Sequence, residues 1–231
     1  NTDEAASLLI DDAKHSIGIN GMEQIQIPGE LTQGVFSRFS PMTDLRGNGT
    51  KFVERLDHIG IASNSNIIAE SIFSGKLGLP VESRQTDMEV KVSMESFTSD
   101  KYGVIYKTRP PETMGGLRVS FITIGDTELE FLENFNDQHR AEITHGTPGN
   151  TKQDQGAITK YVDKYGPGLH HLAFKTPDIN QTLKHLEKHN FKLIDTIGRE
   201  GSRRSLIGFI HPASTGGVLI HFVEREEIID A

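Results

Sequence analysis

Two short stretches, Leu56-Asp-His-Ile-Gly-Ile-Ala62 and Leu169-His-His-Leu-Ala-Phe-Lys175, share one pattern and lie in different halves of the chain. Their residues alternate as in a half-buried β-strand. A second pair follows the first in each half, namely Leu129-Glu-Phe-Leu-Glu133 and Ile220-His-Phe-Val-Glu224. The pairs occur in the same order, so the chain contains an internal repeat.

The residues around these stretches predict the same elements twice. In the first half we expect a strand at residues 55–62, a helix at 64–77 and strands at 89–97, 103–107, 117–124 and 128–134. In the second half we expect a strand at 168–175, a helix from Asp178 to about residue 189 and strands at 191–197, 205–210 and 217–224. Asp178 is expected to cap that helix with Gln181 as its partner. The order β-α-β-β-β occurs twice, which predicts an α+β fold.

Four segments follow from this reading. Residues 1–50 are predicted to form an N-terminal arm or extension, because residues 16–49 are rich in Gly, Pro, Ser and Thr and show no steady period. The first βαβββ module is predicted at residues 51–135, a linker at 136–165 and the second module at 166–231.

Composition excludes several classes of function. Apolar residues make up 35% and charged residues 24% of the 231 residues, as in soluble globular proteins. An apolar run of membrane-spanning length is missing, so we expect a cytoplasmic protein with no membrane contact. The formal net charge is -8 and no basic stripe is visible, which argues against nucleic-acid binding. Cysteine is absent, so any metal must be bound by nitrogen and oxygen ligands.

The repeat also aligns residues that can bind a metal. His58 falls on His171, and Glu130 falls on His221. A carboxylate on an apolar strand face is costly to bury unless it is paired or coordinates a metal. Two modules related by an approximate twofold axis would bring all four side chains together. Three imidazoles and one carboxylate suit one divalent Zn, Co, Ni, Mn or Fe better than Ca or Mg.

The neighbouring residues are expected to lie elsewhere. A single histidine on an apolar strand is more often a hydrogen-bonded core residue than a ligand, but three histidines and one glutamate at repeat-related positions favour a metal. Because side chains alternate along a strand, Asp57 should point away from His58 and His170 away from His171. His170 is therefore left out of the predicted site.

At these residues the chain resembles the vicinal-oxygen-chelate superfamily. That group includes glyoxalase I, methylmalonyl-CoA epimerase, extradiol dioxygenases, 4-hydroxyphenylpyruvate dioxygenase and fosfomycin resistance proteins. The segments at residues 125–133 and 211–220 give a local likeness to methylmalonyl-CoA epimerase. The resemblance implies that the paired βαβββ modules form an incomplete barrel, the glyoxalase fold, with a homodimer as one arrangement. In the resembled family a Glu stands on the last strand, where this chain has His221.

The resemblance implies a divalent-metal-dependent isomerase or lyase that removes a proton next to a metal-bound carbonyl, with an acyl-CoA thioester as one substrate class. The family's acid–base Glu corresponds to Glu112 if a two-residue insertion is allowed. Without that gap Met114 takes the position and the base is missing. His221 is the alternative base if it is not fully bound to metal. Arg203 or Arg204 either holds an anionic group of the substrate or is a surface charge.

Two other functions remain open. Residues 155–173 also resemble the approach to the second ligand strand of 4-hydroxyphenylpyruvate dioxygenase, a non-haem Fe(II) enzyme with two histidines and one carboxylate. That class carries its carboxylate on the last strand, where His221 stands here. The third alternative is a metal-free protein of the same fold that binds a small molecule.

Overall fold

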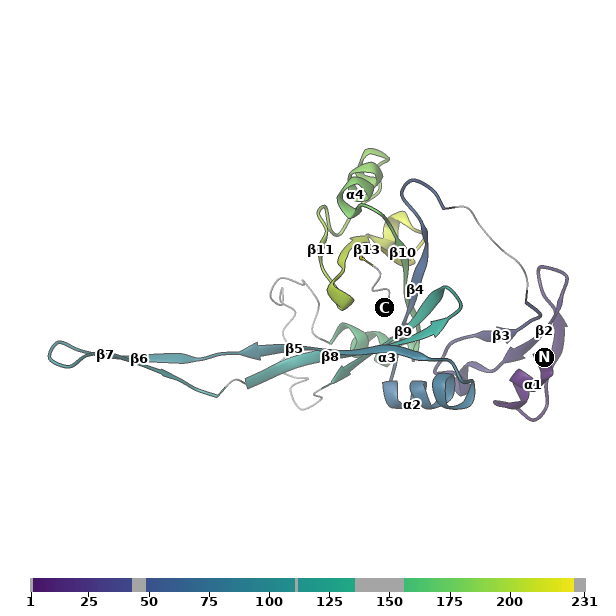
Figure 1. The fold of residues 1–231 in the computed structure, drawn as a ribbon, viewed down its shortest axis with the longest axis horizontal. Coiled ribbons are helices and arrows are strands. Elements are labelled where there is room, and N and C mark those ends of the chain that lie inside the picture. Colours follow the sequence, from purple (N-terminus) through teal and green to yellow (C-terminus); the bar gives the residue numbers. More distant parts are fainter. Residues whose placement is uncertain (1, 43–48, 111, 136–155, 227–231) are drawn as a thin grey trace.

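An eight-stranded mixed sheet, curled into a half-barrel, forms the body of the protein (Figure 1). The computed structural model describes residues 2–42, 49–110, 112–135 and 156–226. The strands lie in the order β11-β12-β13-β10-β4-β9-β8-β5. Their bounds are Arg55–Ala62 (β4), Val81–Lys91 (β5), Glu112–Ile124 (β8), Thr127–Phe135 (β9), Gly168–Lys175 (β10), Arg199–Glu200 (β11), Leu206–Ile210 (β12) and Leu219–Glu224 (β13). The predicted α+β half-barrel is confirmed.

The sheet consists of two similar halves that meet at its centre. From the centre outward, β4-β9-β8-β5 has the same order and directions as β10-β13-β12-β11. The strand that follows each half's helix is the outermost one, and the last strand is parallel to the first. The halves join through the antiparallel pairing of β4 with β10. This arrangement is the structural form of the internal repeat.

The two repeat-related helices begin at side-chain caps and bury one face each. In α2 (Asn66–Glu70), which continues as a π-helical turn over Ser71–Lys76, the Ser65 hydroxyl accepts the Ile68 N–H. In α4 (Ile179–Lys188), the Asp178 carboxylate accepts the Gln181 N–H, as predicted. Each cap satisfies a backbone donor that the first helical turn leaves free. The buried faces then pack on the sheet, as in the cluster of Ile179, Leu183, Ile210 and Phe222.

Two predicted strands differ from the observed ones. Residues 89–97 do not form one strand, because β5 ends at Lys91 and β6 (Met94–Ser99) begins after it. β5 is an edge strand that starts at Val81 and is mostly polar, so it carries little apolar periodicity for a sequence pattern to detect. Residues 191–197 form no strand beyond an isolated bridge between Leu193 and Ile210, and the outer strand of that half is the two-residue β11.

The N-terminal segment contains regular structure where the sequence suggested an irregular extension. A helix, α1 (Thr2–Ser7), packs on a three-stranded sheet of β1 (His15–Ile17), β2 (Glu23–Ile27) and β3 (Ser37–Phe39) around buried Ala6, Ile25 and Ile27. A short 3-10 turn, Gly29–Leu31, follows β2. Gly34 has a φ of +77°, and a Cβ there would lie 1.7 Å from the Pro167 carbonyl oxygen. A side chain is therefore excluded where this unit meets the start of β10.

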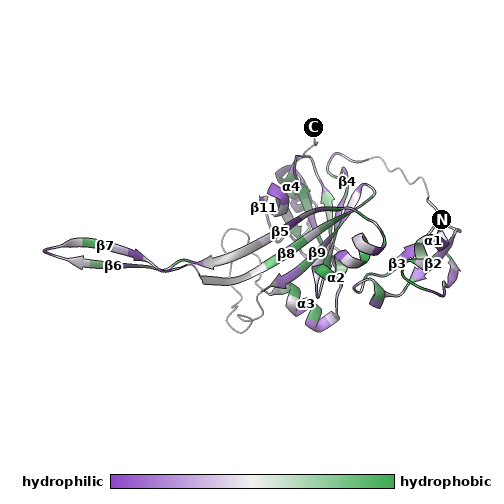
Figure 2. Cartoon of the chain, turned by 60° about the horizontal axis from the view of Figure 1, so that its bottom comes forward, coloured by the Kyte–Doolittle hydropathy of each residue, from purple (hydrophilic) through white to green (hydrophobic). Residues whose placement is uncertain are grey.

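A long hairpin leaves the body between β5 and β8. It is formed by β6 and β7 (Gly103–Thr108), and both views show it as an extension away from the sheet (Figures 1 and 2). Every residue of β7 is exposed, including Ile105, and its cross-strand partner Phe97 in β6 is exposed as well. A two-stranded hairpin of this kind is only marginally stable in water.

A third helix, α3 (Ala157–Tyr165), inserts Ile158 beside Ala62 and Val119 of the main sheet. Among the described residues, none of the helices has the length and apolar character needed to cross a membrane.

Because the hairpin contributes little burial, removing it should leave the body intact. We expect replacement of residues 92–111 by an Asn-Gly turn to change the free energy of unfolding by less than about 1 kcal/mol, or roughly 2–4 °C in a chain of this size. Thermal unfolding followed by circular dichroism measures this. As the comparison, Phe131→Ala removes a fully buried ring and should cost about 3–5 kcal/mol. A hairpin deletion as damaging as Phe131→Ala would show that the hairpin is packed against something that stabilises the chain.

Candidate metal centre

The four predicted ligands meet because of the strand register at the centre of the sheet. Gly60 of β4 pairs with His171 on one side and Glu130 on the other. Ala173 of β10 pairs in the same way with His58 and His221. Each ligand pair therefore flanks a residue with almost no side chain, and the approximate twofold axis brings the two pairs together.

Gly60 leaves the space that the His171 imidazole occupies. A Cβ atom at position 60 would lie 2.1 Å from Cε1 of His171. No substitution with a side chain can keep both the backbone and this ring in place. The glycine is thus a requirement of the site rather than of a turn.

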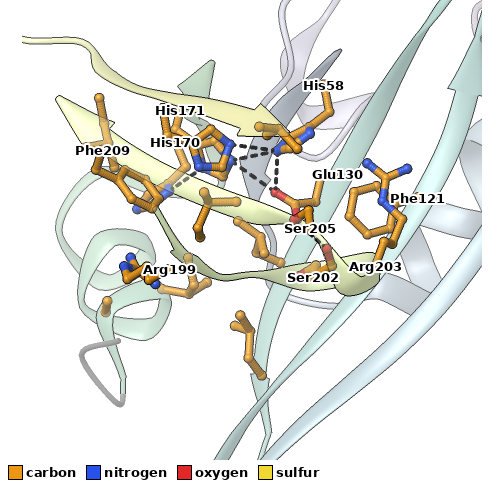
Figure 3. Close-up of a pocket in the computed structure, with 18 of the residues that line it drawn as sticks. His58, Phe121, Glu130, His170, His171, Arg199, Ser202, Arg203, Ser205 and Phe209 are labelled. Atoms are coloured by element: carbon orange, nitrogen blue, oxygen red, sulfur yellow. Dashed lines mark hydrogen bonds and ion pairs between the residues drawn. The ribbon is translucent and has the colours of Figure 1, made fainter. Parts of the chain in front are cut away.

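Ring nitrogens of His58, His171 and His221 lie close together, and Figure 3 shows the Glu130 carboxylate directed toward the rings of His58 and His171. Nε2 of His58 lies 3.3 Å from Nε2 of His171 and 3.1 Å from Nε2 of His221. Oε2 of Glu130 lies 3.4 Å from Nε2 of His58 and 3.1 Å from Nε2 of His171. Donor atoms that bind one transition metal at about 2.0–2.2 Å are separated by about 3.0–3.5 Å. The four measured pairs have this spacing, and each of the four residues is 4% exposed.

A second set of contacts orients two of the histidines. Nδ1 of His58 donates to the Asp57 carboxylate at 2.9 Å, which leaves Nε2 as a lone-pair donor. Nδ1 of His171 lies 3.0 Å from Nδ1 of His170. Among the described residues, Nδ1 of His221 is buried and has no hydrogen-bond partner. His221 is therefore the least anchored of the three imidazoles.

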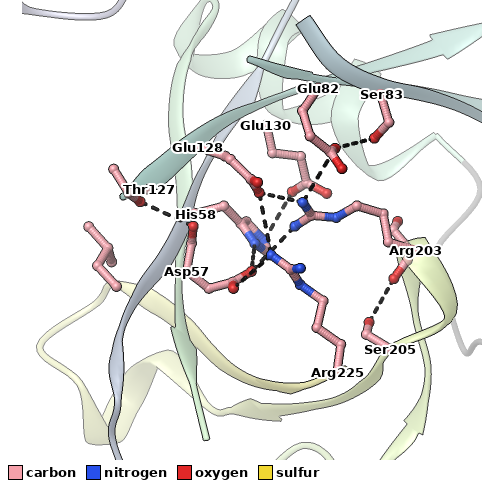
Figure 4. A network of polar contacts seen from close by, with 12 residues as sticks. Asp57, His58, Glu82, Ser83, Thr127, Glu128, Glu130, Arg203, Ser205 and Arg225 are labelled. Atoms are coloured by element: carbon pink, nitrogen blue, oxygen red, sulfur yellow. Dashed lines mark hydrogen bonds and ion pairs between the residues drawn. The ribbon is translucent and has the colours of Figure 1, made fainter. Parts of the chain in front are cut away.

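Asp57 is at the centre of a charged network behind the site (Figure 4). Its fully buried carboxylate lies 3.3 Å from Arg203, 3.0 Å from Arg225 and 3.4 Å from Arg55. Burial raises the pKa of Asp57, but the hydrogen bond and charge of His58, with the charges of Arg225 and Arg203, outweigh it and lower the pKa to about 2. The carboxylate therefore stays ionised and keeps the proton of His58 on Nδ1.

The clustered side chains also influence one another's pKa values. Burial raises the pKa of Glu130, but the charge of His58 and the hydrogen bond and charge of His171 hold that pKa at about 2. Burial lowers the pKa of His221 well below its ordinary value, and the nearby His171 and His58 lower it further. A negative carboxylate beside a neutral imidazole is the protonation state in which both can donate electron pairs to a cation.

These residues lie in a pocket of about 380 Å³. Its walls are mainly apolar and include Leu117, Phe121, Leu132, Ile158, Ile194, Ile207, Phe209, Leu219 and Val223. Polar side chains reach it at Asn134, Ser202, Ser205, His170, Arg199 and Arg203. A cavity with apolar walls and a few convergent polar groups is the usual form of a small-molecule site.

The two arginines singled out by sequence occupy different places. Arg203 lines the pocket, where its guanidinium stacks 3.7 Å above the Phe121 ring. Its charge is already balanced by ion pairs with Glu128, Asp57 and Glu82. Arg204 is exposed and does not line the pocket.

Glu112, the predicted acid–base residue, begins β8 and pairs with Lys91 in the sheet. Its side chain lies outside the described residues, as does that of Met114. Leu117, five positions further along β8, is among the residues that line the pocket.

The expectation that His170 lies on the far side of its strand is wrong. The pairing of β10 with β4 is irregular between Leu169 and His171, and this bulge lets His170 reach the pocket beside His171. Burial and the charge of His171 together lower the pKa of His170 to about 4, against the opposing charge of Glu130. Asp57 does not line the pocket, in line with its expected place on the opposite strand face, but its carboxylate still reaches Nδ1 of the His58 ring.

Arg199 is a pocket residue that sequence reasoning missed. It lies at the start of the two-residue β11, in a stretch where no apolar periodicity marks a strand. Its guanidinium lies 3.1 Å from Asp195 and 5.2 Å from the Phe209 ring. Arg199 belongs to no sequence motif, so its place in the pocket is visible only in the folded structure.

The chain is similar in sequence to several known proteins. The chain is 29% identical over 172 residues to YqjC, an uncharacterized protein of Bacillus subtilis, covering 74% of this chain and 93% of that one. It is 25% identical over 111 residues to the mitochondrial methylmalonyl-CoA epimerase of Dictyostelium discoideum, covering 48% of this chain and 57% of the epimerase. The match thus spans little more than half of that epimerase.

Solved structures show the same fold. The methylmalonyl-CoA epimerase of Mycobacterium tuberculosis superposes with a TM-score of 0.52 at 23% identity, covering 78% of this chain and 93% of the epimerase. The hypothetical protein BH1468 of Bacillus halodurans gives a TM-score of 0.52 at 24% identity, covering 77% and 98%. The model of the glyoxalase/bleomycin resistance protein/dioxygenase superfamily matches residues 57–209, which begin in β4 and end within β12, before β13 and His221. The chain is therefore a member of the glyoxalase/bleomycin resistance protein/dioxygenase superfamily.

Proposed function

We propose that this protein is a divalent-metal-dependent isomerase or lyase that moves a proton next to the carbonyl group of a small substrate. The observation that carries the proposal is the convergence of His58, Glu130, His171 and His221 at the base of an apolar pocket. The epimerase likeness supports the same class of reaction.

The donor set fits a transition metal on chemical grounds. With its Nδ1 proton fixed by Asp57, His58 directs a lone pair toward lone pairs of the other imidazoles and of the Glu130 carboxylate. When the other imidazoles also direct lone pairs to this point, the donors repel one another, and a cation bound between them removes that repulsion. Three nitrogens and one oxygen suit Zn, Co, Ni, Mn or Fe rather than Ca or Mg. When bound, the metal would polarise a carbonyl oxygen as a Lewis acid.

The chain's own residues would bind the substrate and exclude water. Phe121, Ile207 and Val223 would surround its carbon skeleton. Exclusion of water strengthens every electrostatic interaction in the pocket. An acyl-CoA thioester is one candidate substrate, as in the epimerase relatives.

We assign the proton acceptor to His221 rather than Glu112. His221 is in the pocket, and its Nδ1 lacks the outer partner that holds His58 and His171. An imidazole whose second nitrogen has no partner can leave the ligand set more readily than one that is anchored, and its released nitrogen can then accept a proton.

A non-haem iron dioxygenase is the second candidate. His58, His171 and Glu130 together provide the two histidines and one carboxylate of that class. Bound iron with oxygen consumption would favour it. A metal-free preparation that cannot be reconstituted would instead point to a protein that only binds a small molecule.

Metal content of ligand variants provides the first test. We expect about one divalent transition metal per chain in the wild type and none in His171→Ala, because His171 is adjacent to both His58 and Glu130 in the cluster. His221→Ala should retain more metal than His171→Ala but lose activity. Plasma mass spectrometry measures the metal, and the exposed His189→Ala serves as control. A His171→Ala protein with its full metal content would refute the assignment.

A second test addresses the orientation of His58. Asp57→Asn keeps the size of the side chain but removes the charge that fixes the ring, so metal affinity should fall about 10–100-fold. Competition with a fluorescent chelator measures the affinity. Glu95→Gln, on the exposed hairpin, is the matched control. Equal affinity of Asp57→Asn and wild type would mean that Asp57 has only a structural role.

A further inference from the structure

We propose that Arg199 binds a carboxylate of the substrate, so that the substrate is a carbonyl compound with a carboxylate at its other end. This inference rests on the proposed function, because the carbonyl is placed at the metal centre. It assigns the anionic anchor to a residue other than Arg203 and Arg204.

Arg199 is held in place from one side only. Its Nε lies 3.1 Å from Oδ1 of Asp195, whose other oxygen accepts the Phe209 backbone N–H at 3.0 Å. Asp195 is 2% exposed and therefore rigidly placed. One edge of the guanidinium is thus committed to the protein.

The other edge carries an unused donor. Nη1 of Arg199 is buried and has no hydrogen-bond partner among the described residues. A buried donor without a partner is costly, and the cost is greater for a charged group. The guanidinium lines the pocket, so a ligand in the pocket can supply the missing acceptor (Figure 3). Carboxylates match the planar geometry of its donors.

Arg203 does not offer such a donor to a ligand. Glu128, Asp57 and Glu82 surround its guanidinium, and its flat face covers Phe121. Binding a substrate anion there would require it to leave these carboxylates. Arg204 is exposed outside the pocket lining. Arg199 is the pocket arginine with a single carboxylate partner in the described part of the chain.

The position of Arg199 sets the shape of the ligand. Its Cζ lies 5.2 Å from the Phe209 ring centre, and that ring lies 4.5 Å from the His221 ring centre. The Phe209 ring therefore lies close to both the His221 ring and the Arg199 guanidinium, so a ligand that joins the two would lie near this ring. A short aliphatic spacer between carbonyl and carboxylate would pack on this ring and on Ile207.

Calorimetric titration of the metal-loaded protein tests the inference. The probes are 4-oxopentanoate and 6-oxoheptanoate, each compared with its neutral amide and with inorganic phosphate. We expect at least one oxo acid to bind about tenfold or more tightly than its amide, and Arg199→Met to remove that preference. Arg199→Lys should keep part of it, and Arg204→Met should match wild type.

The controls separate misfolding and metal loss from loss of the anchor. Asp195→Asn/Arg199→Met avoids leaving a buried Asp195 charge unpaired, so its preference should also be lost while circular dichroism stays native. Metal content is measured in every variant. A wild type without metal would refute the proposed function, whereas titration of chelator-treated protein with the same acids would still test Arg199. Equal binding of acid and amide, tighter binding of phosphate than of either acid, or an unchanged preference in Arg199→Met would overturn the inference.

Discussion

The antiparallel pairing of β4 with β10 is the contact on which the rest of the structure depends. Each half of the sheet carries two of the four convergent residues, and neither half can form the cluster alone. The register must be correct to the residue, because a shift by one position would turn every side chain of the strand to the opposite face. Gly60 and Ala173 also favour this register, because a glycine and an alanine leave room for the four larger side chains that pair beside them.

Charge is separated across the central strands of the sheet. Behind His58, the Asp57 carboxylate is matched by Arg203 and Arg225, while the pocket side is mainly apolar. This separation lets a buried carboxylate orient an imidazole without itself entering the pocket. The two pocket arginines therefore differ in their partners. Arg203 is paired with three carboxylates and has a structural role, whereas Arg199 is paired with one.

The fold and the convergence of His58, Glu130, His171 and His221 were predictable because the repeat places them at equivalent strand positions. The contacts of Asp57 and His170 were not, because strict alternation fails at a bulge and between adjacent side chains. Most of β5 was not predicted, because an edge strand needs few apolar residues and therefore shows little apolar alternation in the sequence. The role of Arg199 depends on which donors remain unpaired, and a sequence pattern contains no information about that.

The division of the cluster between two halves links binding to cohesion. A ligand that contacts all four residues binds only when β4 and β10 are paired, because residues 58 and 221 are 163 positions apart in the chain. By mass action, the free energy of that binding adds to the free energy that holds the halves together. Ligand binding at the four residues and the pairing of β4 with β10 are thus coupled in a single equilibrium. While the ligand is bound, even a weak interface between the two modules keeps the sheet together.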